Sequence, residues 1–151
     1  MRLVAFILSK SSYESIEYTV SKIPNIINDF FISEDTQDKN ILEIAKKNNY
    51  KLIYNKRESG YGSNVKNSLR HAFNELNADY AIEVHGDHAQ FDPAATYDAL
   101  SYLKDNYDFI SGSRFLEFKK NMKYGYPLER MIPNFFISSF ERLLLKIPLS
   151  D

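Results

Sequence analysis

The stretch "YAIEVHGDHAQFDPAATYDAL", residues 80–100, carries the pattern that decides the fold. It opens with an apolar run over 80–84 and continues through a polar loop with two histidines and two aspartates. A helical pattern follows from 94 to 105. A short apolar run followed by a turn and a helical pattern is typical of a strand that crosses over into a helix.

The same unit recurs along the chain, which indicates an α/β fold. Strand and helix alternate five times, and this order predicts a mostly parallel sheet with helices on both faces in a single domain, 1–151. The other apolar runs lie at 3–8, 26–32, 50–54 and 107–112, and the other helical patterns lie at 13–22, 38–48 and 63–77.

Composition excludes several classes of protein. The 151 residues include 19 basic and 20 acidic side chains, a net charge of -1, which does not indicate a nucleic-acid binder. The absence of cysteine excludes disulfides and thiolate metal sites, so any metal must be held by carboxylate, imidazole or amide groups.

No segment reaches the roughly 18 apolar residues of a membrane span, and the first strand lacks a signal-peptide cleavage site. We therefore expect a cytoplasmic protein.

Polar segments follow four of the predicted strands, at 33–40, 55–68, 84–93 and 111–115. Ligands bind at the carboxyl ends of the strands in sheets of this kind, so these segments should share one edge. Each also has a purely structural interpretation. Asp38 and Asp92 suit helix N-caps, Gly60 and Gly62 suit a turn, and His85 suits a partly buried strand end.

Five segments occur along the chain in this order: "SEDTQDKNILEIAKK", "ESGYGSNVKNSLRHAF", "ADYAIEVHGDHAQFDP", "YDFISGSRF" and "LLLKIPLSD". Taken together, they resemble the family 2 glycosyltransferases with the GT-A fold, particularly the branch related to dolichol-phosphate mannosyltransferase. The resemblance implies a Rossmann-like sheet that binds a nucleotide-diphosphate sugar. It further implies transfer of the sugar to a lipid-phosphate or glycan acceptor.

The resemblance also assigns roles to individual residues. Glu34 and Asp35 would receive the base and the ribose, and the turn at Gly60 and Gly62 would close beside the nucleotide. Asp87 would bind the metal and take part in catalysis. His85 and Gln90 would also bind the metal, and Gln90 would lie beside the nucleotide. Arg114 and Arg130 would face the diphosphate or a lipid phosphate, and Arg114 would take part in catalysis.

A divalent cation is the implied cofactor. Hard oxygen ligands favour Mg²⁺ or Mn²⁺, and a histidine ligand shifts the preference toward Mn²⁺. The family's first metal-site aspartate appears here as His85, and "HGDHAQFDP" is one residue longer than the usual spacing. The family's acceptor-side region would follow Asp151, so we expect a chain that is truncated after its donor-binding half.

Two alternatives to an active transferase remain open. One is a non-catalytic nucleotide-sugar-binding module of the same fold. The other is a nucleotidyltransferase, although "SKSSYESI" lacks the glycines that such an enzyme carries in its first loop.

The C-terminal segment "NFFISSFERLLLKIPLSD" repeats apolar residues at helical spacing. Such a stripe packs against a sheet or a second subunit, or it lies in a bilayer interface. We therefore expect self-association or peripheral contact with the inner face of a membrane. The stripe consists of Phe136, Phe140, Leu143, Leu144 and Ile147.

Overall fold

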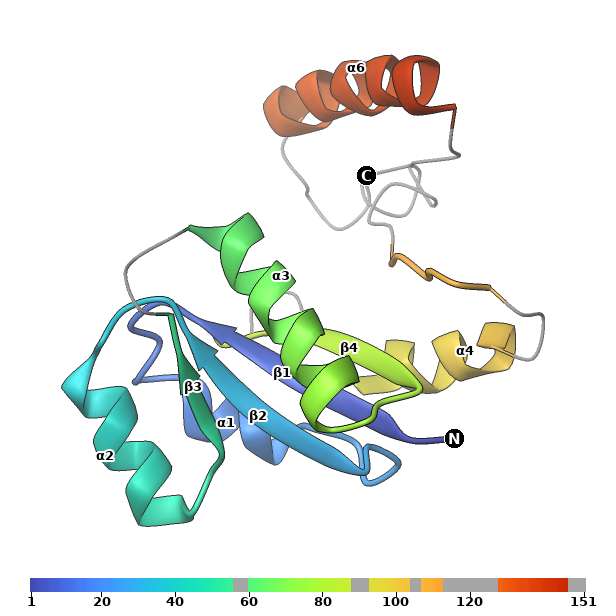
Figure 1. The fold of residues 1–151 in the computed structure, drawn as a ribbon. Coiled ribbons are helices and arrows are strands. Elements are labelled where there is room, and N and C mark those ends of the chain that lie inside the picture. The colour runs from blue at the N-terminus through green and yellow to red at the C-terminus, as the bar shows by residue number, and fades with distance from the viewer. Residues whose placement is uncertain (56–59, 88–92, 104–106, 113–127, 147–151) are drawn as a thin grey trace. The chain divides into compact units, whose positions relative to one another are not determined.

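The computed structural model describes residues 1–55, 60–87, 93–103, 107–112 and 128–146. The chain divides into two compact units, Met1–Asp98 and Ala99–Asp151. The first unit contains the sheet and its core, and the second contains a long helix. Figure 1 shows the course of the chain, with the elements labelled.

A parallel sheet forms the centre of the first unit, as the alternation of strands and helices predicted. Its strands run in the order β3-β2-β1-β4, and every neighbouring pair in the described chain is parallel. β1 is buried along its whole length, which explains its uninterrupted apolar sequence. The strands are β1 (Leu3–Ser9), β2 (Asp29–Glu34), β3 (Leu52–Tyr54) and β4 (Tyr80–His85).

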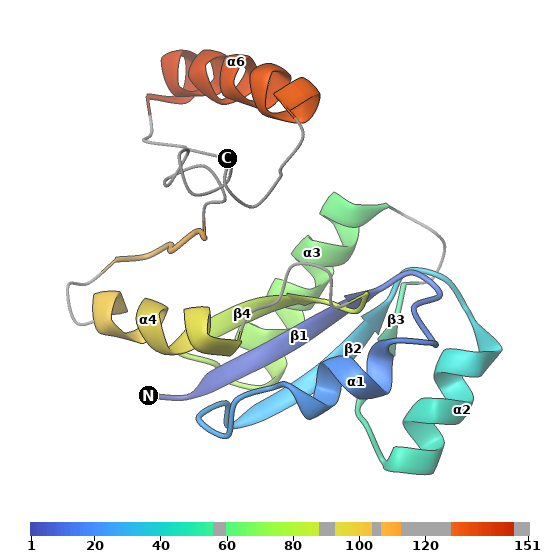
Figure 2. The same ribbon diagram turned by 180° about the vertical axis from the view of Figure 1, so that it is seen from behind.

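Helices cover both faces of this sheet, which confirms the predicted layering. α1 (Ile16–Ser21) and α2 (Lys39–Asn48) lie on one face. α3 (Tyr61–Arg70), extended by the π-helical turn η1 (His71–Glu75), lies on the other. The two faces are best compared in Figures 1 and 2, which differ by half a turn.

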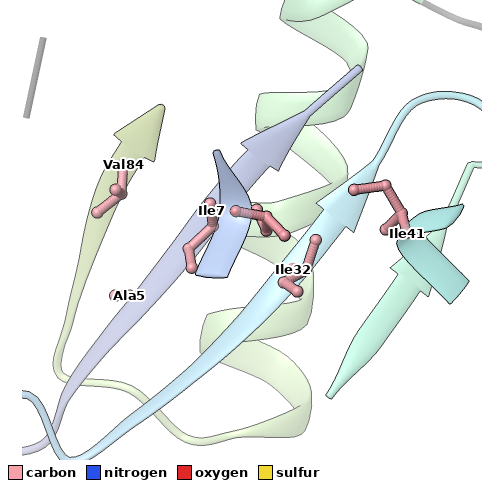
Figure 3. Close-up of a cluster of buried hydrophobic side chains, with 6 residues drawn as sticks. Ala5, Ile7, Ile32, Ile41 and Val84 are labelled. Carbon is pink, nitrogen blue, oxygen red and sulfur yellow. The ribbon is translucent and has the colours of Figure 1, made fainter. Parts of the chain in front are cut away.

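Alternate residues of the strands build two separate hydrophobic clusters. On the α1 and α2 face, Ala5 and Ile7 pack with Ile32, Ile41 and Val84, as Figure 3 shows. On the opposite face a second cluster packs against η1. Because side chains alternate along a strand, each residue's face follows from its position. The second cluster consists of Val4, Phe6, Leu8, Phe31 and Ala72.

The starts of α2 and α4 (Pro93–Leu103) agree with the sequence to within one residue, α1 begins three residues later than predicted, and one predicted strand is wrong. Asp38 caps α2 by accepting a hydrogen bond from the Asn40 N–H, 2.8 Å away, as predicted. α4 begins one residue before the helical pattern predicted from 94, and Asp92, the expected N-cap, lies outside the described residues. Residues 107–112, predicted as a fifth strand, contain no strand. Asp108 and Gly112 are poor strand formers, so the short apolar run overstated the signal.

The second unit contains α6 (Leu128–Leu145). Among its described side chains Ser138 is buried, whereas the predicted apolar stripe is exposed at each of its described positions, with Phe136 at 67% and Leu143 at 75%. Ile147 lies outside the described residues. In the part of the chain that the structure describes, no helix is both long and apolar enough to cross a membrane.

Candidate functional site

A cleft of about 370 Å³ opens at the carboxyl edge of the sheet, between β1 and β4. The chain leaves β1 toward β2 on one side, and it later returns to place β4 on the other side of β1. This reversal of strand order is the place where open α/β sheets bind ligands. The lining residues are Leu8, Ser9, Lys10, Ser12, Asp35, Tyr61, Asn64, His85, Gly86 and Asp87.

The first wall of the cleft is the loop after β1, and Glu34 holds this loop in place. Glu34 Oε1 accepts hydrogen bonds from the Ser11 N–H at 3.1 Å and from the Thr36 N–H at 3.0 Å. The Thr36 hydroxyl donates a third hydrogen bond to the same oxygen. Ser11 has a φ of 58°, a left-handed conformation that costs a non-glycine residue about 1 kcal/mol or more. Glu34 therefore stabilises a strained turn beside the cleft.

Glu34 has no solvent exposure, although the sequence placed it in a polar segment after the second strand. Its second oxygen, Oε2, is buried and has no hydrogen-bond partner among the described residues. The reason lies in the strand register, because β2 continues to Glu34, which pairs with Ser9 of the central strand. The carboxylate thus lies inside the molecule, where it contacts the protein's own donors.

Asp35 lines the cleft, although only 3% of it is exposed. Its Oδ1 accepts a hydrogen bond from the Asn55 side chain at 2.8 Å, and its Oδ2 accepts one from the Gly60 N–H at 3.0 Å. Gly60 has a φ of 79°, which a residue with a side chain rarely adopts, and it precedes the first turn of α3. Asp35 therefore fixes the start of α3 against the end of β2.

The two glycines of the predicted turn have separate positions. Gly60 caps α3, and Gly62 lies within the first turn of that helix. A side chain added at Gly62 would meet nothing within 4 Å. Tyr61, between them, lines the cleft, as does the buried Asn64, whose amide nitrogen donates a hydrogen bond to the Ser33 carbonyl at 3.1 Å.

The second wall of the cleft follows β4, and Gly86 anchors it. Its N–H donates to the Leu8 carbonyl at 2.8 Å. Its own carbonyl accepts hydrogen bonds from the hydroxyls of Ser15 and Thr19, at 2.8 and 3.0 Å. A Cβ on residue 86 would lie 2.7 Å from the Leu8 carbonyl oxygen, so only glycine fits without a shift of the backbone. This close packing fixes His85 and Asp87 on either side of Gly86.

His85 is part of a three-residue group that crosses from β4 to α3. Its Nε2 lies 3.3 Å from Glu83 Oε1, and the Tyr61 hydroxyl donates a hydrogen bond to the same oxygen. The Tyr61 and His85 rings stack with their centroids 5.9 Å apart and their planes at 24°. The sequence named His85 but not Glu83 or Tyr61, because the pairing joins residues 22 positions apart.

These contacts shift the pKa of each group. The Glu83 carboxylate raises the pKa of His85 above its ordinary value, and the His85 ring lowers the pKa of Glu83 below its own. Burial, followed by the hydrogen bond to Glu83, raises the pKa of Tyr61 to about 12. Tyr61 therefore keeps its proton, and remains a donor, at any ordinary assay pH.

Asp87 is exposed at the edge of the cleft, next to Gly86. The described residues include no cluster of three histidine, aspartate or glutamate side chains that could enclose a metal. Gln90 and Arg114 lie outside the described residues. Arg130 lies in α6, and its side chain is outside what the structure describes. The structure thus brings together Asp35, His85 and Asp87 from the predicted set.

Lys10 also lines the cleft, and it was not among the residues predicted from the sequence. It follows the central strand directly, where β1 gives way to the loop. Its position after an apolar strand was a usable signal, since polar residues at that place face the ligand edge.

Comparison with known proteins gives a family match and a structural similarity. The family described as Glycosyl transferase family 2 matches residues 11–149. No curated protein matches the chain. The crystal structure of S. aureus TarS 1-349 is similar over 78% of this chain, with 14% sequence identity and a TM-score of 0.46. This chain spans 40% of the length of that TarS chain.

Proposed function

Because this chain belongs to glycosyl transferase family 2, we propose that it transfers a sugar from a nucleotide-diphosphate sugar to a lipid-phosphate or glycan acceptor. The observation that carries this proposal is the cleft at the point where the strand order reverses. A nucleotide binds there with its polar groups facing the strand ends.

The β2 side and the β4 side of the cleft suit different parts of the donor. Asp35 and the Gly60 backbone lie at the β2 side, where a carboxylate can accept hydrogen bonds from a base or from ribose hydroxyls. The diphosphate then lies toward the β4 side, beside His85 and Asp87. Lys10, at the start of the first wall, offers a positive charge to the same phosphates.

A divalent cation fits the donor groups on the β4 side. The Asp87 carboxylate and the His85 imidazole would hold it, and a bound Mg²⁺ or Mn²⁺ would neutralise the charge that develops on the diphosphate leaving group. Two protein ligands are fewer than either cation needs, so phosphate oxygens and water would complete its coordination. Gly86 keeps these two side chains at their positions by its packing on β1.

A lipid phosphate is the acceptor that the motif order favours, because that order resembles the dolichol-phosphate mannosyltransferase branch. α6 supports the choice, since exposed apolar side chains with Arg142 and Lys146 suit a helix that lies in a bilayer interface. We therefore propose peripheral contact with a membrane, with self-association as the alternative. Flotation with anionic liposomes and light scattering distinguish the two.

Incubation with labelled UDP-sugars or GDP-sugars, Mn²⁺ and a polyprenyl phosphate tests the proposed reaction. We expect label in the lipid fraction, reduced at least tenfold by Asp87→Ala. Binding of a sugar nucleotide without product from any acceptor would identify a binding module instead. Absence of binding to every sugar nucleotide would contradict the proposal.

A further inference from the structure

The group Glu83, Tyr61 and His85 has a geometry that a structural role alone does not explain. Along β4, Ala81, Glu83 and His85 alternate with Ile82 and Val84, so they lie on the face that α3 and η1 cover. Residues on a covered sheet face are usually apolar. Here a carboxylate occupies that face, partly buried, and it contacts Tyr61 and His85, which both line the cleft.

The position of Glu83 determines which nitrogen of His85 remains for a ligand. Nε2 lies 3.3 Å from the carboxylate. If Nε2 carried no hydrogen, its lone pair would face a lone pair of the carboxylate oxygen, and the two would repel. In the neutral ring the hydrogen therefore sits on Nε2, and Nδ1 carries the free lone pair. Among the described residues, no hydrogen bond to Nδ1 is present. A histidine that binds a metal through one nitrogen usually presents the other to a carboxylate in this way.

Tyr61 restricts the same ring from a second direction. Its hydroxyl donates to Glu83, which fixes the carboxylate, while its ring stacks on the imidazole. Tyr61 is itself held in place, because the preceding Gly60 N–H is bonded to Asp35. A continuous path of contacts therefore links Asp35, at one wall of the cleft, to His85 at the other.

We infer that Glu83, supported by Tyr61, is a positioning residue that holds His85 with Nδ1 free for a divalent cation bound together with a nucleoside diphosphate. The inference rests on the proposed function. It deepens that function by predicting that this chain favours Mn²⁺ over Mg²⁺, since an imidazole nitrogen suits the softer cation. Asp87 supplies the carboxylate, and diphosphate oxygens supply further ligands.

The first test reads the tautomer of His85 in the metal-free protein. Long-range ¹H–¹⁵N NMR at a pH where the ring is neutral should show the hydrogen on Nε2, with the signal assigned by its loss in His85→Gln. Glu83→Gln and Tyr61→Phe should each increase the Nδ1–H form. Glu43→Gln, which removes an exposed carboxylate on α2, should leave the signal unchanged. A tautomer mixture in the unaltered protein would overturn the inference without touching the proposed function.

The second test measures Mn²⁺ binding by electron paramagnetic resonance, with GDP or UDP as the probe nucleotide. We expect Glu83→Gln to weaken Mn²⁺ binding in the presence of the nucleotide by 10- to 100-fold. The nucleotide affinity without metal should not change. Tyr61→Phe should show a smaller loss in the same direction, and it provides the test if Glu83→Gln does not fold. Equal Mn²⁺ affinity in all variants would overturn the inference, and failure of the unaltered protein to bind either nucleotide would overturn both proposals.

Discussion

The ends of β2 and β4 flank the central strand in equivalent positions, yet their polar side chains are used differently. At the end of β2, Glu34 and Asp35 are almost wholly buried, and donors of the protein itself occupy three of their four oxygens. At the end of β4, His85 is partly exposed and Asp87 is exposed. Burial therefore separates the two ends: Glu34 and Asp35 hold groups of the protein, so that Asp35 has only its cleft-lining edge left for a ligand, whereas the side chains after β4 are more open to one.

The largest effect is expected at Glu34. Glu34→Ala removes the acceptor of three hydrogen bonds and leaves the N–H groups of Ser11 and Thr36 without it. We expect a loss of about 3 kcal/mol in the free energy of unfolding, measured by chemical denaturation. Glu34→Gln keeps an accepting oxygen and should lose clearly less.

The opposite result at Glu34 would give the ends of β2 and β4 the same role. If the Ala variant kept its stability and lost nucleotide affinity, Glu34 would contact the base and ribose, as the resemblance implied. The β2 end would then face the ligand in the same way as the β4 end.

Gly86 should show the next largest effect, because it anchors the β4 end against β1. Gly86→Ala brings a Cβ to 2.7 Å from the Leu8 carbonyl oxygen and should cost about 1–3 kcal/mol of stability. Gly62→Ala is the matched control, since its Cβ meets nothing within 4 Å and alanine is the better helix former. Thermal denaturation of both variants checks the difference, and equal losses would show that the close approach at Gly86 is not limiting.

The sequence predicted the layered α/β fold because the apolar periodicity of β1, β2 and β4 is set by burial, which local sequence reports directly. It also predicted the Asp38 cap, which depends on a contact only two residues away. It did not predict the burial of Glu34, which follows from pairing with Ser9, or the contact between Tyr61 and Glu83. Those features depend on residues that meet only after the chain has folded.

Asp87 tests the β4 side of the comparison. We expect Mn²⁺ to strengthen nucleoside diphosphate binding. Asp87→Ala should lower the affinity measured with Mn²⁺ at least tenfold, which corresponds to about 1.4 kcal/mol of that gain. Because Asp87 is exposed, the melting temperature should barely move. Calorimetric titration with and without Mn²⁺ measures the gain, and Asp87→Asn separates loss of charge from loss of shape. An identical metal gain in the variant would place the cation elsewhere.

The smallest effect is expected at Asp38, the third acid of the segment after β2. The Ser11 hydroxyl, followed by the Asn40 N–H, lowers the pKa of Asp38 below its ordinary value. Since the folded-state pKa is the lower one, the cap contributes stability above the unfolded-state pKa and loses it as the pH falls through the folded-state pKa. Asp38→Ala should therefore cost about 0.5–1 kcal/mol at neutral pH and progressively less below about pH 4.

Asp38→Asn keeps a capping side chain that does not titrate, so its stability relative to Asp38→Ala should stay constant with pH. Denaturation curves across this range decide the point, and a cost of Asp38→Ala that did not shrink in acid would mean that the charge of Asp38 adds nothing to its cap.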